Sequence, residues 1–451
     1  MKRIITAFLV FCFVFVGCTN GESSVLDSQT DISTEITTDT SLVSETDYKQ
    51  QSRGLAEKMQ AGDFSEIVSL LSEEMKEQIS EDQLKTAWNS TIASLGDYIG
   101  IYDISQQPKQ PSDNMITITV IFEYENNGLS LYLTYDENGR IVGLWLNYRA
   151  IQGEPVSNEI FEEIPIIVGG DNYPLDGLLT IPKDTQSYPI VVLIHGSGPN
   201  DMDETVGTNK PFRDIARALA EQGIATIRYN KRSNQYPMSE ATDISAEVLE
   251  DASFAIDLAA QYSDKVFIIG HSLGGMLAPK IALDNPEIMG LISLAGSPRR
   301  LEDIIFDQQM AQAQKLYSSQ EQLDNVEQTL NSINSSIKSA GENDTALYYG
   351  APAKYWYSLN KIDTPAILSQ LDIPMLFLQG ADDFQVYADK DFEEWKNLLS
   401  QNPNSQFILY ENLNHLFMKS NGYTDLNEYN IAGVVDSKVI NDIAKWIDDN
   451  S

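Results

Sequence analysis

The chain has 451 residues, two cysteines and a formal net charge of −36 at pH 7, with an isoelectric point near 4.2. This length accommodates two or three domains, and a hydrophobic fraction of 42% is ordinary for a globular protein. The strong negative charge argues against binding of nucleic acid or anionic lipid head groups through general electrostatics, and it disfavours polyanionic substrates.

Residues 1–18 predict a lipoprotein signal peptide. Residues 1–3 are basic, and residues 4–16 form an apolar run that is too short to span a bilayer comfortably. The run leads into Phe15-Val16-Gly17-Cys18, which resembles a bacterial lipobox with phenylalanine where leucine is usual. We therefore expect a lipid on Cys18 that anchors the mature protein to the extracytoplasmic face of a bacterial cell membrane. An ordinary secretory signal is the alternative.

The other cysteine, Cys12, lies within the apolar run and would leave with the signal peptide. The mature chain could then form no intramolecular disulfide and no cysteine metal site. Residues 19–46 are rich in Ser, Thr, Asp and Glu and poor in large apolar residues, which predicts a disordered tether.

Residues 47–150 predict a small α+β domain. Helical periodicity runs through 54–59, 64–75 and 83–95, and Ser80 and Gln83 have the spacing of a capping box. The period then changes to two in 116–124, 129–135 and 141–146, with Asn-Gly turns between the runs. Three helices followed by an antiparallel meander resemble the small NTF2-like or cystatin-like domain, of the DUF3887 type, that precedes secreted hydrolases.

Residues 161–451 alternate between strands and helices, which predicts a doubly wound, mostly parallel α/β sheet. The predicted strands are 189–194, 224–229, 266–269, 290–294, 375–379 and 407–410, and the predicted helices are 211–222, 245–262 and 275–283. The alternation stops at about 298–365, where the sequence predicts a Gln- and Ser-rich helical insertion with a Tyr/Trp cluster near its end. The insertion lies where a lid is expected.

Gly270-His271-Ser272-Leu273-Gly274 follows one predicted strand and precedes a helix. Strand, sharp turn and helix are the context that a G-x-S-x-G nucleophile elbow requires. A serine nucleophile needs a base, and the base needs an orienting acid. The sequence therefore predicts Ser272 as a nucleophile and directs the search to histidines and carboxylates elsewhere in the chain.

Of the three histidines, His415 alone follows both the elbow and a candidate acid, and it comes just after the last predicted strand. His271 lies beside the serine and should point away from it, and His195 is expected to brace its loop. The acid should follow the penultimate strand, where Asp382 and Asp383 both stand. The order of serine, aspartate and histidine is that of an α/β-hydrolase triad.

An oxyanion hole needs two backbone N–H donors. The residue after the nucleophile, Leu273, is expected to supply one, and Ser197, in the glycine-rich loop after the first parallel strand, the other. The acidic residues of 201–204 are expected to form a solvated or substrate-shaping loop rather than a cation site, because no oxygen-ligand spacing is present. The basic residues of 228–232 are expected to form ion pairs with an acidic surface.

Several motifs carry a resemblance that spans about 161 to the C-terminus: His-Gly-Ser-Gly-Pro at 195–199, Lys-Pro-Phe-Arg-Asp at 210–214, Arg-Tyr-Asn-Lys-Arg at 228–232, the elbow, and Asn-His-Leu-Phe at 414–417. They resemble exported α/β-hydrolase-fold esterases of the serine aminopeptidase-like and dienelactone-hydrolase-like branches. The family register Gly-x-x-Asp-x-x-Val falls on residues 380–386 and implies Asp383 as the acid, with Asp382 as the alternative.

The predicted function is an extracytoplasmic serine hydrolase that cleaves small or lipid-like carboxylic esters through an acyl-enzyme, with no cofactor, no metal and no nucleic-acid partner. An aminopeptidase-like peptidase or an acyltransferase could use the same triad, because fold and triad do not determine the acceptor. A non-catalytic surface binding protein built on a hydrolase scaffold is the alternative from another class. A complete set of nucleophile, base, acid and oxyanion loop argues against it.

Overall fold

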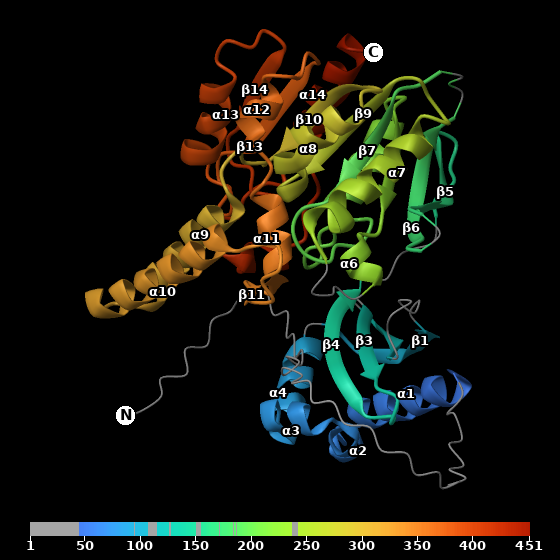
Figure 1. Cartoon of the computed structure of the whole chain (residues 1–451). Helices are drawn as coiled ribbons and strands as arrows, with labels where there is room; N and C mark the ends of the chain where they lie inside the picture. The colour runs from blue at the N-terminus through green and yellow to red at the C-terminus, as the bar shows by residue number, and fades with distance from the viewer. Residues whose placement is uncertain are drawn as a thin grey trace, which may run out of the picture. The chain divides into compact units, whose positions relative to one another are not determined.

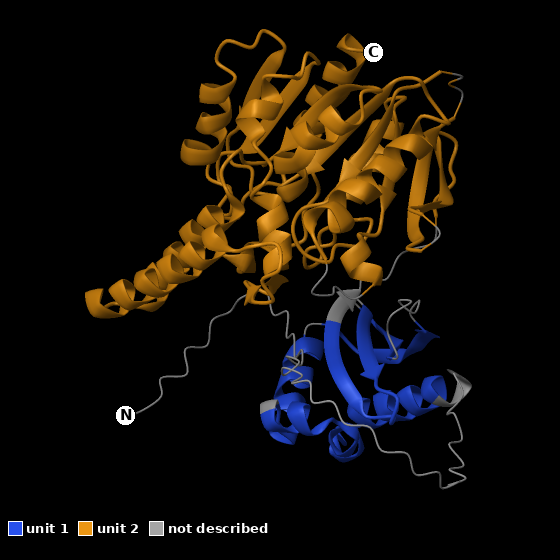
Figure 2. Cartoon of the chain, in the orientation of Figure 1, with its two compact units in different colours: residues 1–151 blue, residues 152–451 orange. Residues whose placement is uncertain are grey.

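The chain divides into two units in the computed structural model, residues 1–151 and residues 152–451 (Figure 2). The structure describes residues 45–93, 95–106, 115–125, 128–149, 155–170, 172–183, 185, 187–236 and 242–451. The predicted signal peptide, Cys18 and nearly all of the predicted tether lie outside these residues. Within the described ranges, every helix is too short or too polar to cross a bilayer.

The first unit packs helices on one antiparallel sheet whose strands lie in the order β1-β2-β3-β4 (Figure 1). Alternate residues of the central strands, such as Val120, Phe122 and Leu131, join Trp88 of α4 in one apolar core. The elements are α1 (Glu45–Gln60), α2 (Ser65–Leu70), α3 (Glu73–Gln78), α4 (Glu81–Ile92), β1 (Tyr98–Gln106), β2 (Ile116–Tyr124), β3 (Gly128–Tyr135) and β4 (Ile141–Arg149).

The expected capping box at the start of α4 is confirmed, because Ser80 and Gln83 exchange both of its hydrogen bonds. The single helix expected over 64–75 is wrong. The chain leaves the helical path at Leu71, which forms a β-bridge with Ile141, and Ser72 then caps a second helix by accepting from the Met75 N–H. The apolar pattern alone predicts a continuous helix, but the bridge to β4 takes Leu71 out of the helical conformation and a new helix begins after Ser72.

The second unit is built on an eight-stranded sheet in the order β14-β13-β10-β9-β7-β8-β6-β5. The strands from β14 to β8 run parallel, and β6 and β5 add an antiparallel edge. The strands are β5 (Phe161–Val168), β6 (Leu175–Pro182), β7 (Ile190–Ile194), β8 (Ala225–Tyr229), β9 (Val266–His271), β10 (Ile288–Leu294), β13 (Met375–Gly380) and β14 (Ser405–Tyr410).

Helices cover both faces of this sheet (Figure 1). On β7, Ile190, Val192 and Ile194 pack with α7 and α8, while Val191 and Leu193 pack with α5 and α14, which explains why the strand is apolar at every position. These and the remaining helical segments are α5 (Pro211–Ala220), α6 (Arg232–Gln235), η1 (Ser245–Leu249), α7 (Glu250–Ala259), α8 (Leu273–Asp284), η2 (Ala388–Phe392), α13 (Glu393–Leu398), η3 (Leu426–Asn430) and α14 (Ser437–Asp449).

The expected helical insertion lies between β10 and β13, and α9 and α10 form a hairpin that extends away from the sheet (Figure 1). Ala313, Val326 and Leu330 form a small core between the two helices. The segments of the insertion are α9 (Leu301–Leu316), α10 (Gln320–Ser339), β11 (Leu347–Tyr348), β12 (Ala351–Pro352), α11 (Ala353–Leu359) and α12 (Thr364–Leu368).

Candidate active site

The elbow lies where β9 ends and α8 begins. Ser272 has φ 53° and ψ −113°, a backbone conformation that serine rarely adopts, and its N–H donates to the Leu294 carbonyl of β10 at 2.8 Å. A methyl group on Gly274 would stand 2.2 Å from the Ile194 carbonyl oxygen, so only glycine lets α8 approach β7 this closely. The strained turn thus presents a partly exposed Ser272 beyond the carboxyl end of the central strand.

The structure brings Asp383 and His415 together. His415 Nδ1 lies 2.7 Å from Asp383 Oδ2, and both residues are buried. The other carboxylate oxygen accepts from the backbone N–H groups of Gln385 and Val386, and Gln379 donates to Oδ2 at 2.8 Å. Four donors therefore fix the orientation of this carboxylate. Asp382, the alternative acid, is exposed.

The loop that carries His415 contacts the elbow through His271. His271 Nε2 lies 2.9 Å from the His415 carbonyl oxygen, and the centroids of the two imidazole rings are 4.6 Å apart. A carbonyl only accepts hydrogen bonds, so Nε2 of His271 carries a proton. The two segments, 144 positions apart in sequence, are joined at this bond, which lies next to Ser272.

The expected oxyanion loop also reaches the elbow. A methyl group on Gly196 would lie 3.2 Å from Ser272 Cβ, so the backbone of this loop runs against Ser272. Leu273 is the first residue of α8, and its N–H is one of those that have no acceptor within their own helix. Both predicted donors therefore lie close to Ser272 along the chain: Leu273 follows it directly, and Ser197 follows Gly196, whose backbone borders it.

Of the two expectations for the acidic loop at 201–204, the solvated one is wrong, because Asp201, Asp203 and Glu204 are all buried. Burial and the neighbouring Asp203 raise the pKa of Asp201 to about 6. Burial alone would raise the pKa of Glu204, but the adjacent His271 imidazole holds it below its usual range. For His271, burial opposes protonation, yet the Glu204 carboxylate raises its pKa above the usual value.

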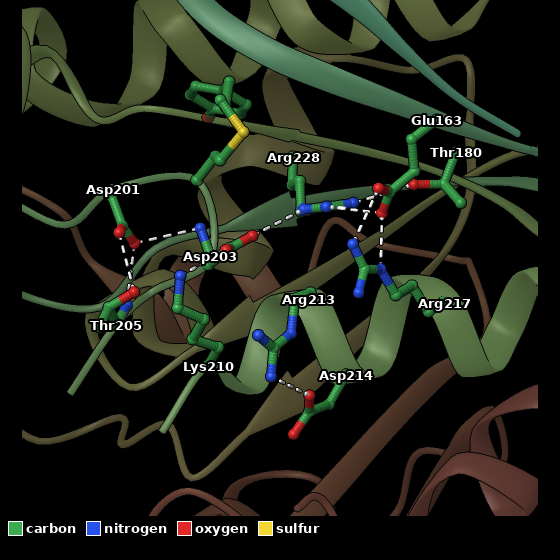
Figure 3. Close-up of polar contacts among 12 residues, drawn as sticks. Glu163, Thr180, Asp201, Asp203, Thr205, Lys210, Arg213, Asp214, Arg217 and Arg228 are labelled. Carbon is green, nitrogen blue, oxygen red and sulfur yellow. Dashed lines mark hydrogen bonds and ion pairs between the residues drawn. The ribbon is translucent and has the colours of Figure 1, made fainter. Parts of the chain in front are cut away.

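A chain of buried ion pairs explains how this loop can be buried (Figure 3). Arg228 of β8 donates to Asp203 at 3.0 Å and to Glu163 of β5 at 2.8 Å. Arg217 of α5 binds the same Glu163 carboxylate with two hydrogen bonds of 2.9 Å. Arg228 is only 1% exposed, so its expected ion pairs lie within the fold and not on an acidic surface. The polar loop is thereby attached to the sheet edge.

His195 lies directly after β7, as expected from the sequence, and its ring contacts β8 and α5. Its Nε2 lies 2.5 Å from the Tyr229 carbonyl oxygen, and its ring stacks on Phe212 with centroids 5.0 Å apart. Burial lowers its pKa to about 4. His195 thus braces neighbouring strand β8. Within the described ranges, no group of three His, Cys, Asp or Glu residues is arranged to hold a metal ion.

Comparisons with known proteins agree with this architecture. Residues 186–421 match the family described as "Serine aminopeptidase, S33". The chain belongs to this family. Residues 52–144 of this hydrolase match a family described as a protein of unknown function (DUF3887). The expected α/β-hydrolase fold and the DUF3887-type first domain are thereby confirmed.

The most informative relative is Esterase EstD of Thermotoga maritima, which is 35% identical over 408 residues and is matched over 89% of this chain and 95% of EstD. The S33 hydrolase described here is thus an esterase, as expected from its sequence. Among solved structures, Est1E from Butyrivibrio proteoclasticus has a TM-score of 0.43 at 16% identity, covering 63% of this chain and 98% of Est1E. The Pyrococcus furiosus esterase PF2001 has a TM-score of 0.43 at 14% identity, covering 64% and 91%.

Sequence reasoning missed three residues that border the site. Gln379, at the end of β13, donates to Asp383. Glu204 accepts from the Gly196 N–H, and Lys231 donates to the Gly196 carbonyl oxygen. The position of Gln379 four residues before the acid could have indicated its role. For Glu204 and Lys231 no local signal exists, because their charged partners, His271 and Glu247, come from other segments of the chain.

Proposed function

We propose that this esterase hydrolyses carboxylic esters through an acyl-enzyme on Ser272, with His415 as the base and Asp383 as the orienting acid. The observation that carries the proposal is the 2.7 Å contact from His415 Nδ1 to the buried Asp383 carboxylate, in a loop held against the elbow. With its Nδ1 proton directed at Asp383, His415 leaves Nε2 free to accept a proton.

In the first half-reaction, Ser272 Oγ attacks the acyl carbonyl carbon while His415 Nε2 takes the hydroxyl proton. The carbonyl oxygen becomes an oxyanion, which the N–H groups of Ser197 and Leu273 stabilise. When the tetrahedral intermediate collapses, the bond to the alkoxy group breaks and His415 returns its proton to the departing alcohol. In the second half-reaction, water attacks the acyl-enzyme while His415 takes a proton from it. The bond to Ser272 Oγ then breaks, His415 returns the proton to Oγ, and the carboxylic acid leaves.

The test is turnover of p-nitrophenyl esters by the wild-type protein and by Ser272→Ala. We expect the variant to fold and to lose activity by at least about 10³-fold, because the nucleophile is absent. Activity within about tenfold of wild type would overturn the assignment of Ser272. The family description also names an aminopeptidase, so aminoacyl p-nitroanilides belong in the same panel. Faster turnover of these amides than of the esters would favour a peptidase.

We further propose that a lipid on Cys18 anchors the esterase to the extracytoplasmic face of a bacterial membrane, where small or lipid-like esters reach it. The support is the basic start, the short apolar run and the lipobox-like end of residues 1–18. Cys18→Ala should leave an unprocessed precursor that takes up no palmitate in metabolic labelling. Labelling that persists in this variant would contradict the anchor.

A further inference from the structure

The backbone of Gly196 is held from both sides by buried charged side chains. Its N–H donates to Glu204 Oε1 at 2.7 Å, and its carbonyl oxygen accepts from Lys231 Nζ at 2.9 Å. Asn200 Nδ2 adds a longer contact to the same carbonyl at 3.2 Å. Glu204 and Lys231 are each only 2% exposed. Hydrogen bonds between a buried charge and a peptide group are among the stronger ones in proteins.

The Lys231 contact determines where the next amide points. In a planar trans peptide the C=O of Gly196 and the N–H of Ser197 point in opposite directions. Once Lys231 fixes the Gly196 carbonyl, the Ser197 N–H therefore has one direction available to it. A cation on the carbonyl also polarises the peptide, which makes its N–H a better donor. Ser197 is the residue whose N–H we assign to the oxyanion hole.

Glu204 also connects the loop of Gly196 to the loop that carries His415, the proposed base. Glu204 Oε1 lies 3.1 Å from His271 Nδ1, and His271 Nε2 donates to the His415 carbonyl. The Glu204 carboxylate therefore lies beside the imidazole whose Nε2 holds the His415 carbonyl, and it raises the pKa of that imidazole. One carboxylate thus connects the oxyanion loop, the elbow and the loop that carries His415.

Holding Glu204 in place is costly for the fold. Its φ of 51° lies in the left-handed region that non-glycine residues rarely adopt, and its buried Oε2 has no hydrogen-bond partner among the described residues. The ion pair from Arg228 to the preceding residue, Asp203, holds this segment of loop against the sheet (Figure 3). Strain and unpaired polar atoms that the surrounding structure enforces are concentrated at functional sites.

We propose that Glu204 and Lys231 are positioning residues for ester hydrolysis, which together aim the Ser197 N–H at the oxyanion of the tetrahedral intermediate. This inference rests on the oxyanion hole of the proposed function. It assigns these residues no contact with the substrate, because they act through the Gly196 backbone.

The test compares an ester with its thionoester, in which sulfur replaces the carbonyl oxygen. Sulfur is a larger and poorer hydrogen-bond acceptor, so a thionoester gains little from correctly placed N–H donors. The wild-type protein should prefer the ester. In Lys231→Met and Glu204→Ala we expect kcat for the ester to fall by about 100-fold, with KM almost unchanged and a much smaller loss for the thionoester. The preference should therefore shrink by at least about tenfold.

The ratio of ester to thionoester turnover is measured on one preparation of each variant, so it does not depend on the fraction of protein that has folded. Glu204→Gln, which keeps an oxygen for the Gly196 N–H, should retain more of the preference than Glu204→Ala. Asp251→Asn is the matched control, because it alters a buried carboxylate of α7 whose partner is Arg232. Its ratio should stay within about twofold of wild type.

An unchanged ratio in both Lys231→Met and Glu204→Ala would overturn the inference, whatever happens to the rates. Equal losses on the two substrates leave this ratio unchanged, and they indicate general damage to the protein and not a misplaced donor. A wild-type protein that turns over both substrates equally would instead contradict the oxyanion hole itself. The two failures are thus distinguishable.

Discussion

Two aspartates stand side by side after β13, and their surroundings differ. Asp383 is 5% exposed and accepts four hydrogen bonds, one of them from His415, whereas the Asp382 side chain is exposed. We expect Asp383→Asn to lower kcat by about 10³–10⁴-fold, because an amide disfavours the tautomer of His415 that leaves Nε2 free.

Asp382→Asn is the adjacent control and should stay within about threefold of wild type. Both variants are compared through kcat and kcat/KM on a short p-nitrophenyl ester. If Asp382→Asn costs as much as Asp383→Asn, or more, the carboxylate assigned to the triad is the wrong one.

His195 should make stability depend on pH. Its pKa in the folded protein is about 4 because it is buried, against about 6.5 in an unfolded chain. As pH falls below about 6.5, the unfolded chain binds a proton that the folded chain does not bind. The free energy of unfolding is therefore highest above this pH and decreases towards pH 4. The loss between about pH 7.5 and pH 5 should be about 2 kcal/mol.

His195→Gln keeps a donor for the Tyr229 carbonyl but has no proton to bind in this range. Urea unfolding at both pH values measures the change in the free energy of unfolding for each protein. The wild-type decrease should exceed that of the variant. Equal decreases would mean that His195 titrates normally in the folded state.

The residues proposed for the triad could be selected from the sequence because each lies in its own short motif and their chain order is that of an α/β-hydrolase. Ser272 stands between a strand and a helix, and the structure brings Asp383 and His415 together across 32 positions. The acidic loop could not be predicted in the same way. Whether Glu204 is solvated or buried depends on Arg228 and Glu163, which come from strands that the sequence does not show to be neighbours.

Among the secondary-structure elements, the ion pairs of Figure 3 attach the loop of residues 196–204 to the sheet edge. Arg228 joins β8 to β5 and to Asp203, and both of its carboxylate partners are buried. We expect Arg228→Leu to lower the free energy of unfolding of the hydrolase unit by about 3 kcal/mol, because it leaves buried charges with one partner fewer.

Arg213→Leu provides the comparison on the neighbouring helix. The Arg213 side chain is 34% exposed and lies 3.2 Å from Asp214, so its loss should cost less than about 1 kcal/mol. Thermal and urea unfolding of the two variants measure the difference. Similar losses in both would show that the buried network contributes no more than a surface pair.

Regular elements were predictable where one apolar pattern decides them. The parallel strands are apolar on both faces, and their order of alternation with helices gives the doubly wound sheet. The pattern failed where a non-local contact intervenes, as at Leu71, whose bridge to Ile141 divides a predicted helix. The edge strand β1 was not predicted, because it mixes exposed and half-buried positions and so has no clear alternation.

At the scale of the whole molecule, every residue assigned to the chemistry lies within the second unit, residues 152–451. That unit has its own sheet with an apolar core on each face. A chain that starts at residue 155 keeps the Val156 N–H bond to Glu163 at 2.8 Å, which a start at Phe161 would remove. We expect this truncated protein to turn over short soluble esters with kcat/KM within about tenfold of the full chain.

The truncated protein is first shown to be folded by circular dichroism. A loss of more than about 100-fold, or roughly 2.7 kcal/mol of transition-state stabilisation, would mean that the first unit takes part in catalysis.

Sequence separated the α+β region from the hydrolase because the hydrophobic period changes between them. It does not indicate what the first unit binds, since that region carries no short motif of known chemistry.

Covalent labelling tests most directly whether Ser272 is the nucleophile and whether His415 activates it. A fluorophosphonate probe phosphonylates an activated serine, and mass spectrometry of the digested protein locates the adduct. We expect one adduct, on the peptide that contains Ser272, no labelling in Ser272→Ala, and labelling slowed by at least about 100-fold in His415→Ala. An adduct on another serine, or undiminished labelling of Ser272→Ala, would contradict the assignment of Ser272.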